Sequence, residues 1–255
     1  MAQENIKDIK IEQKTKVKEN KKDKIIDKKE EHKKEELKKV YLVDYYIKDL
    51  TLDKFLETNL PDKITPNVND KVVIFKGKKP ILEGMGDIFP KVEETIKSLK
   101  DGEEKTLKLS PIDAYGLRNK ELLRVVSKNV FKENKINPFV GLTFETEGAY
   151  GVVKSVSGGR VLVDFNSPYA DHDIEVYIKK IKTCNEKETI ETILETFFPK
   201  VEAKLKSFEN SKITIEMKLL EGQTKEMYQK IFDGFFKNFI KYNKIEIIEK
   251  NKKEQ

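Results

Sequence analysis

The stretch that most constrains the fold runs from Lys105 to Gly116 and reads KTLKLSPIDAYG. Its first half alternates apolar and charged residues, as a half-buried strand does. The strand then meets a turn formed by Pro111 and Asp113, which presents Tyr115 directly before a glycine. A second stretch, residues 161–178, reads VLVDFNSPYADHDIEVYI, two strand-like runs around a polar turn. Together the two stretches predict antiparallel β-structure with a tyrosine presented at a turn.

Charge is concentrated at the start of the chain. Residues 1–39 hold 14 Lys and 10 Asp or Glu, so they carry a net +4 of the formal +6 of all 255 residues. Their apolar residues are isolated, and we expect a charged, low-complexity tail that does not fold by itself. RNA or ribosome contact through this tail is an alternative. The interspersed acids argue against it, because phosphate binding calls for a patch of one sign.

The remaining composition favours a protein of the cytoplasm without a cofactor. Cys184 is the single cysteine, so no intramolecular disulfide can form and a reducing compartment fits. The sequence has no run of 18 apolar residues and no signal-peptide core, so we expect no membrane contact. His32 and His172 are the only histidines. Without a Cys/His ligand set or a glycine-rich phosphate loop, we predict neither a metal site nor a bound cofactor.

The periodicity of the chain predicts three folded regions. The first has strands at residues 39–46, 70–75 and 104–109, with a helical pattern through Val92, Ile96 and Leu99. The second is β-rich: residues 121–126 and 130–131 precede strands at 141–144, 150–156 and 160–165, with Gly158-Gly159 as a hairpin turn. Residues 173–181 then return to the first region.

A separate α/β region follows from residue 187. We expect helices at 188–198 and 225–241 and strands at 201–208, 212–219 and 244–248. The second helix carries one stripe of Met227, Ile231, Phe235 and Phe239, with Tyr228, Phe232 and Phe236 beside it. These residues are predicted to be core, and a homodimer face is the alternative.

Two motifs carry a family resemblance: PIDAYG at residues 111–116 and DFNSPYADHDIEVYI at residues 164–178. They resemble the FKBP-type peptidyl-prolyl cis-trans isomerases, in the SlyD-like branch and its long archaeal-type form. The resemblance implies an α+β fold: an antiparallel FKBP half-barrel around a short helix, an inserted β-rich flap domain and a small C-terminal α/β domain. The implied boundaries are 40–117 plus 170–183 for the isomerase domain, 118–169 for the inserted chaperone domain and 187–255 for the C-terminal domain.

The resemblance also implies which residues form the isomerase pocket. Tyr45, Phe55 and Tyr115 match its aromatic residues, and Ile88 with Phe89 matches the apolar pair at the helix entry. Three pocket positions depart from the family pattern. Leu56 replaces an aspartate, and Val92 and Val176 replace rings. Losing two rings costs about 0.5–1.5 kcal/mol each beyond area burial, so we expect weakened or absent isomerase activity.

The inserted region is predicted to bind unfolded or proline-containing polypeptides, because it has more apolar residues than so small a unit can bury. The residues expected to bind are Leu122, Leu123, Val140, Phe144, Tyr150, Val152, Pro168 and Tyr169. For about half of them, a place in the core of the region is an equal alternative. A catalytically inactive holdase on the same fold is the alternative function.

Overall fold

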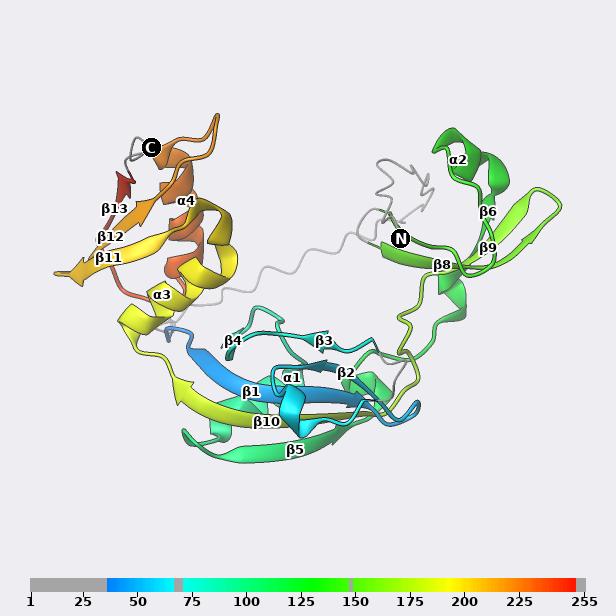
Figure 1. The fold of residues 1–255 in the computed structure, drawn as a ribbon, viewed down its shortest axis with the longest axis horizontal. Helices are drawn as coiled ribbons and strands as arrows, with labels where there is room; N and C mark the ends of the chain where they lie inside the picture. The colour runs from blue at the N-terminus through cyan, green and yellow to red at the C-terminus, as the bar shows by residue number, and fades with distance from the viewer. Residues whose placement is uncertain (1–35, 67–70, 147–148, 251–255) are drawn as a thin grey trace, which may run out of the picture. The chain divides into compact units, whose positions relative to one another are not determined.

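A computed structural model describes residues 36–66, 71–146 and 149–250 (Figure 1). The described chain divides into two compact units, residues 115–172 and residues 36–114 with 173–250. Each unit has its own sheets and helices and is described by itself. The expected tail, residues 1–39, lies almost wholly outside the described residues, and so does the ribosome contact predicted for it.

A six-stranded sheet dominates the larger unit, with β1 (Val40–Asp49) at its centre. Its strand order is β3-β2-β1-β10-β5, and β4 also pairs with β1. All pairings are antiparallel except that of β2 with β3. The other strands are β2 (Lys54–Thr58), β3 (Val73–Ile74), β4 (Lys79–Leu82), β5 (Glu104–Leu109) and β10 (Ile174–Thr183).

Helix α1 (Pro90–Ser98) packs against β10. It begins with a proline at its first position, where the missing N–H costs no hydrogen bond. Val92 and Ile96 lie one turn apart and are fully buried. The chain leaves the helix through Gly102, whose φ of +90° favours glycine. The predicted helix and the strand that follows it are therefore confirmed.

The smaller unit contains a four-stranded sheet in the order β6-β9-β8-β7. Gly158 and Gly159 both have positive φ and join two of its strands, as the sequence predicts. Phe131 lies in a short helix within this β-rich region, where the Ser127 side chain caps the turn that follows β6. The elements are β6 (Leu123–Ser127), α2 (Lys128–Glu133), β7 (Thr143–Thr146), β8 (Ala149–Ser157) and β9 (Arg160–Asp164).

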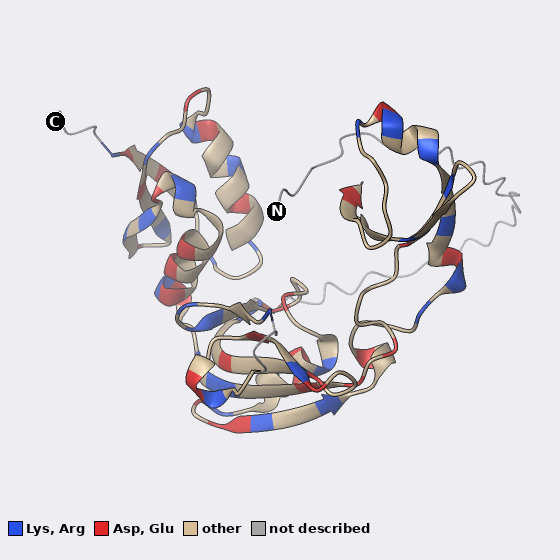
Figure 2. Ribbon diagram, turned by 45° about the vertical axis from the view of Figure 1, so that its right-hand side comes forward, with Lys and Arg blue, Asp and Glu red and all other residues tan. Residues whose placement is uncertain are grey.

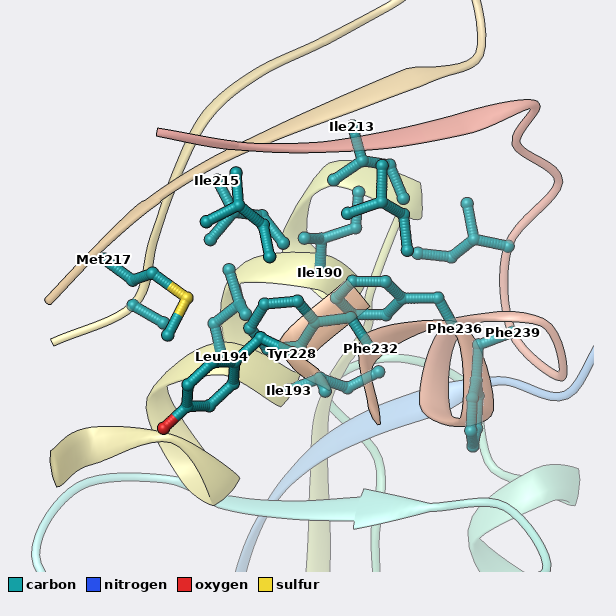
Figure 3. Packing of buried hydrophobic residues seen from close by; sticks show 14 of the residues in the cluster. Ile190, Ile193, Leu194, Ile213, Ile215, Met217, Tyr228, Phe232, Phe236 and Phe239 are labelled. Atoms are coloured by element: carbon teal, nitrogen blue, oxygen red, sulfur yellow. The ribbon is translucent and has the colours of Figure 1, made fainter. Parts of the chain in front are cut away.

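The C-terminal part of the larger unit is a three-stranded sheet in the order β11-β12-β13 with two helices. The last two strands are parallel, and the second helix forms the crossover between them. Figure 3 shows both helices and β12 contributing to one apolar core. The elements are α3 (Glu186–Phe197), β11 (Lys204–Glu209), β12 (Lys212–Met217), α4 (Lys225–Phe236) and β13 (Lys244–Glu249).

The two predicted stripes of α4 behave differently. Phe232 and Phe236 are fully buried and Tyr228 is nearly so, whereas Met227 and Ile231 are 48% and 43% exposed. The stripe that begins at Tyr228 is therefore the core-facing one, and the stripe that begins at Met227 leaves its first two residues in solvent.

The described helices and sheets together confirm the predicted mixed α+β class.

Figure 2 shows basic and acidic residues interspersed along the ribbon in both units. No helix of the described residues is long and apolar enough to cross a membrane. No three His, Cys, Asp or Glu side chains among them are grouped as metal ligands would be.

Candidate functional site

A hydroxyl–carboxylate pair lies on the buried face of the six-stranded sheet. Tyr45 of β1 is 1% exposed, and its hydroxyl donates a hydrogen bond to the Glu57 carboxylate of β2. Glu57 also lies 3.6 Å from the ammonium of Lys79. Three residues from three strands thus hold a tyrosine hydroxyl, a carboxylate and a cation next to one another. Sequence reasoning named only the tyrosine.

A bulge in β2 decides which side chains share this face. Ile47 pairs with Glu57, but the next residue of β1, Lys48, pairs with Phe55, so Leu56 is the extra residue. Glu57 therefore shares the face of Tyr45 and Ile47, because alternate residues of a strand point to the same side. Leu56 is itself buried, at 7% exposure.

The bulge corrects the predicted wall of the pocket. Phe55 lies on the opposite face, where its ring meets the Tyr46 ring edge-on at 5.3 Å between centroids. Tyr46 also stacks on Tyr177 at 5.3 Å, so these three rings form their own cluster. The structure therefore does not bring Phe55 together with Tyr45. The family pattern has an aspartate where this chain has Leu56. In the structure, the carboxylate beside Tyr45 comes from the next residue, Glu57.

An aromatic ring and a cation border the tyrosine. The Phe75 ring, 37% exposed, lies 6.4 Å from that of Tyr45. The Lys79 ammonium lies 4.3 Å from the centre of the Phe75 ring and 5.8 Å from that of Tyr45. Cation–π contacts of this kind are worth about 0.5–2 kcal/mol. They hold Lys79 beside Glu57.

The helix entry brings two more predicted residues to this unit. Phe89 is the N-cap residue of α1, with a φ of −57° and a ψ of 139°, and its carbonyl accepts hydrogen bonds from the N–H groups of Val92 and Glu93. Ile88 and Phe89 are half-buried. Val92 and Val176 are both 0% exposed, so the two positions that depart from the family pattern are filled by small buried side chains.

Tyr115 lies in the other unit, so the structure does not assign it a place beside Tyr45. Its ring packs against that of Tyr169 at 5.0 Å. The carbonyl of Gly116 accepts a 3.0 Å hydrogen bond from the N–H of Asp171, and the N–H of Arg118 donates to the Asp171 carboxylate at 2.9 Å. These bonds join the two chain segments at the base of the smaller unit. The role of Tyr115 in the pocket stays a prediction.

Asp164 anchors the same base. It is 3% exposed and accepts hydrogen bonds from the Arg118 guanidinium at 2.5 Å and the Asn166 side chain at 2.8 Å. Burial alone would raise the pKa of this carboxyl. The hydrogen bonds from Asn166 and the charge of Arg118 outweigh burial and hold the pKa below its usual value.

The predicted polypeptide-binding residues of the smaller unit divide between surface and core. Phe144 is 6% exposed and belongs to the core, as the alternative for these residues allowed. Sequence reasoning missed Val125 and Phe139, which are 64% and 59% exposed. Their strand and turn contexts gave no signal of exposure. Of the remaining predicted residues, Leu123, Val140, Tyr150 and Pro168 are exposed, and Leu122, Val152 and Tyr169 are half-buried.

Comparison with known proteins assigns the class. Residues 124–169 match the model of the family described as FKBP26, IF domain. A stretch of 109 residues is 31% identical to the FKBP-type 16 kDa peptidyl-prolyl cis-trans isomerase of Escherichia coli, covering 38% of this chain and 72% of that relative. The chain belongs to the FKBP-type peptidyl-prolyl cis-trans isomerase family.

Two further relatives are more distant in sequence. The short-type peptidyl-prolyl cis-trans isomerase of Methanocaldococcus jannaschii is 29% identical over 96 residues, 38% of this chain and 61% of the relative. The SlyD isomerase of Treponema pallidum is 27% identical over 117 residues, 43% of this chain and 65% of the relative. The chain thus spans less than two thirds of the length of these two relatives.

Proposed function

We propose that this chain catalyses cis–trans isomerisation of Xaa–Pro peptide bonds and also binds unfolded polypeptides. The observation that carries the first activity is the Tyr45–Glu57 pair on the buried face of the sheet. Rotation about a peptide bond is opposed by about 18–20 kcal/mol of amide resonance. Fixed polar groups in a dry site lower such a barrier by stabilising the charge redistribution of the twisted amide. No cofactor or proton transfer is required.

The isomerase activity is proposed to be weak. Val92 and Val176 leave the site without two of the rings that the family resemblance implies, and each ring is worth about 0.5–1.5 kcal/mol. Since about 1.4 kcal/mol is tenfold in rate, the loss corresponds to roughly one to two decades in turnover. Leu56 adds nothing to this loss, because Glu57 supplies the carboxylate.

Exchange spectroscopy of a short Xaa–Pro peptide tests this activity. Tyr45→Phe removes the hydroxyl that binds Glu57 and is expected to lower the catalysed rate about tenfold. Tyr46→Phe is the matched control, because it removes the neighbouring hydroxyl on the opposite face, which donates to Glu175 at 3.1 Å. Equal loss in both variants, or in neither, would contradict the assigned face. An inactive wild type that still protects an aggregating protein would favour the holdase.

The polypeptide-binding activity is proposed for residues 115–172. Its support is the set of exposed apolar side chains, most of all the adjacent Phe139 and Val140, at 59% and 66% exposure. Such a surface binds extended apolar segments of other chains. Phe139→Ser with Val140→Ser is expected to reduce suppression of reduced-insulin aggregation, measured by light scattering. The control replaces two exposed leucines of the larger unit, Leu52→Ser with Leu220→Ser, and an equal effect there would refute the assignment.

A further inference from the structure

The edge strand β3 and the residue that follows it expose three consecutive apolar residues. Val73, Ile74 and Phe75 are 53%, 56% and 37% exposed. In the described part of the chain, β3 pairs with β2 on one side and with no strand on the other. Proteins ordinarily blunt such edges, because a flat apolar edge invites pairing with another chain. A run of exposed apolar residues on an edge therefore calls for a functional reason.

The opposite edge of the same sheet shows the usual protection. On β5, the exposed side chains are Glu104, Lys105, Thr106 and Lys108, and its terminal Leu109 is buried. Of these two edges, as far as the structure describes them, the one at β3 combines exposed apolar side chains with an open strand.

One residue of β3 directs its backbone N–H and C=O groups away from β2, toward the open edge of the sheet. The N–H of Phe75 donates to the carbonyl of Thr58 at 2.9 Å, so Phe75 directs its backbone groups toward β2. Since successive residues of a strand direct these groups to opposite sides, Ile74 presents its N–H and C=O to the open edge. An added strand would bond to Ile74.

The charges around the edge indicate what such a strand carries. Lys71 and Lys76 are exposed and flank the apolar run. The next two lysines are already paired, Lys78 with Asp44 at 2.7 Å and Lys79 with Glu57 at 3.6 Å. A second copy of this chain would add its own Lys71 and Lys76 to the same edge, so that like charges would gather on both strands. An apolar segment with acidic residues complements both the run and its flanks.

We propose that the open edge of β3 docks an extended, apolar, acid-bearing segment of another polypeptide as an added strand. The choice of a polypeptide client rests on the proposed function. The edge continues into the candidate site, because the Phe75 ring lies 6.4 Å from Tyr45 and 4.3 Å from the Lys79 ammonium. A docked segment would therefore lie close to the Tyr45–Glu57 pair.

Two synthetic peptides of identical apolar sequence and without proline test the proposal on the full-length protein. One is flanked by glutamates and its twin by lysines, and both are labelled for fluorescence anisotropy. We expect the glutamate-flanked peptide to bind at least tenfold more tightly at low salt. Hydrogen exchange of residues 71–76 is expected to slow when that peptide is bound, because the outward N–H of Ile74 becomes bonded.

Ile74→Pro removes the outward N–H and leaves the bond from Phe75 to Thr58 in place. We expect about a tenfold rise in Kd for the glutamate-flanked peptide, with only a few-fold rise for Ile74→Thr, which keeps the N–H. Circular dichroism verifies that both variants are folded. Lys71→Glu with Lys76→Glu is expected to reverse the preference between the two peptides.

Three results would overturn the proposal: equal affinity for the two peptides, unchanged affinity in Ile74→Pro, or saturation without slower exchange at residues 71–76. The last would place the binding elsewhere, as in residues 115–172. Isomerisation of an Xaa–Pro tetrapeptide is measured in parallel. An uncatalysed rate there refutes the isomerase activity, whereas the peptide comparison still decides the role of the β3 edge.

Discussion

At the residue scale, the bulge at Leu56 determines which side chain faces Tyr45. Leu56 and Glu57 are neighbours in sequence, yet of the two only Glu57 binds the tyrosine hydroxyl, and Leu56 is 7% exposed. Restoring the family aspartate at position 56 would therefore bury a second carboxylate without a partner. The polar group that the site needs is already present.

We predict that Leu56→Asp destabilises the protein and does not raise turnover. Burying an unpaired polar group costs about 1–3 kcal/mol or more, and at this size each kcal/mol lowers the melting temperature by about 2–4 °C. Glu57→Gln is the comparison variant. It keeps nearly the same volume and is expected to lower isomerase turnover with a small change in melting temperature. A Leu56→Asp protein of normal stability and higher turnover would refute this reading of the bulge.

The lowered pKa of Asp164 predicts that the smaller unit loses folding stability in acid. Its pKa is lower in the folded state than in the unfolded state, where carboxyls of this type titrate near 3.8. The hydrogen bonds to it therefore stabilise the fold fully above that value, and the stabilisation is lost as pH falls through the folded pKa. Asp164→Asn is expected to be less stable at pH 7 and to show a shallower loss of stability as the pH falls below about 3.8. Urea unfolding across pH measures both, and parallel pH curves for the two proteins would contradict the prediction.

At the scale of elements, α4 has one buried and one exposed apolar stripe. Phe232→Ala is expected to cost about 3–5 kcal/mol, because it leaves a cavity in the core between α3 and β12. Met227→Ala removes a side chain that is 48% exposed and is expected to cost less than about 1 kcal/mol. Chemical denaturation of both variants provides the measurement. Similar losses would mean that the Met227 stripe is also covered, as in a dimer.

The elements differ in how far sequence predicts them. The strand at 104–109 and the Gly158-Gly159 hairpin follow from alternation and from glycine at positive φ, which are local properties. Strands β2 and β4 are short and mixed in character, KFLET and KPIL, and their pairing with β1 is set by distant residues. The role of Glu57 could not be predicted from the sequence for the same reason. The bulge that turns Glu57 toward Tyr45 exists only when β2 is paired with β1. The face of α4 that is buried likewise depends on what packs against it.

At the scale of the whole molecule, residues 115–172 leave and re-enter the larger unit on adjacent strands. Leu109 of β5 pairs with Ile174 of β10, so the chain ends at this junction are close in space. Asp173 is held independently: its carbonyl accepts from the N–H of Leu50 at 2.8 Å, and its N–H donates to the Thr51 hydroxyl at 3.1 Å. The larger unit therefore has the contacts to close without the smaller one.

We predict that joining Ala114 to Asp173 through two glycines leaves a folded protein that no longer suppresses aggregation. The six-stranded sheet and the C-terminal core keep all their strands, so the melting temperature is expected to change by a few degrees only. Isomerisation of a tetrapeptide then separates two contributions. A rate that persists assigns catalysis to the Tyr45–Glu57 face alone, whereas a rate that falls to the uncatalysed level shows that the removed residues, Tyr115 among them, complete the pocket. Retained suppression of aggregation would locate polypeptide binding in the larger unit, where the β3 edge is the strongest candidate.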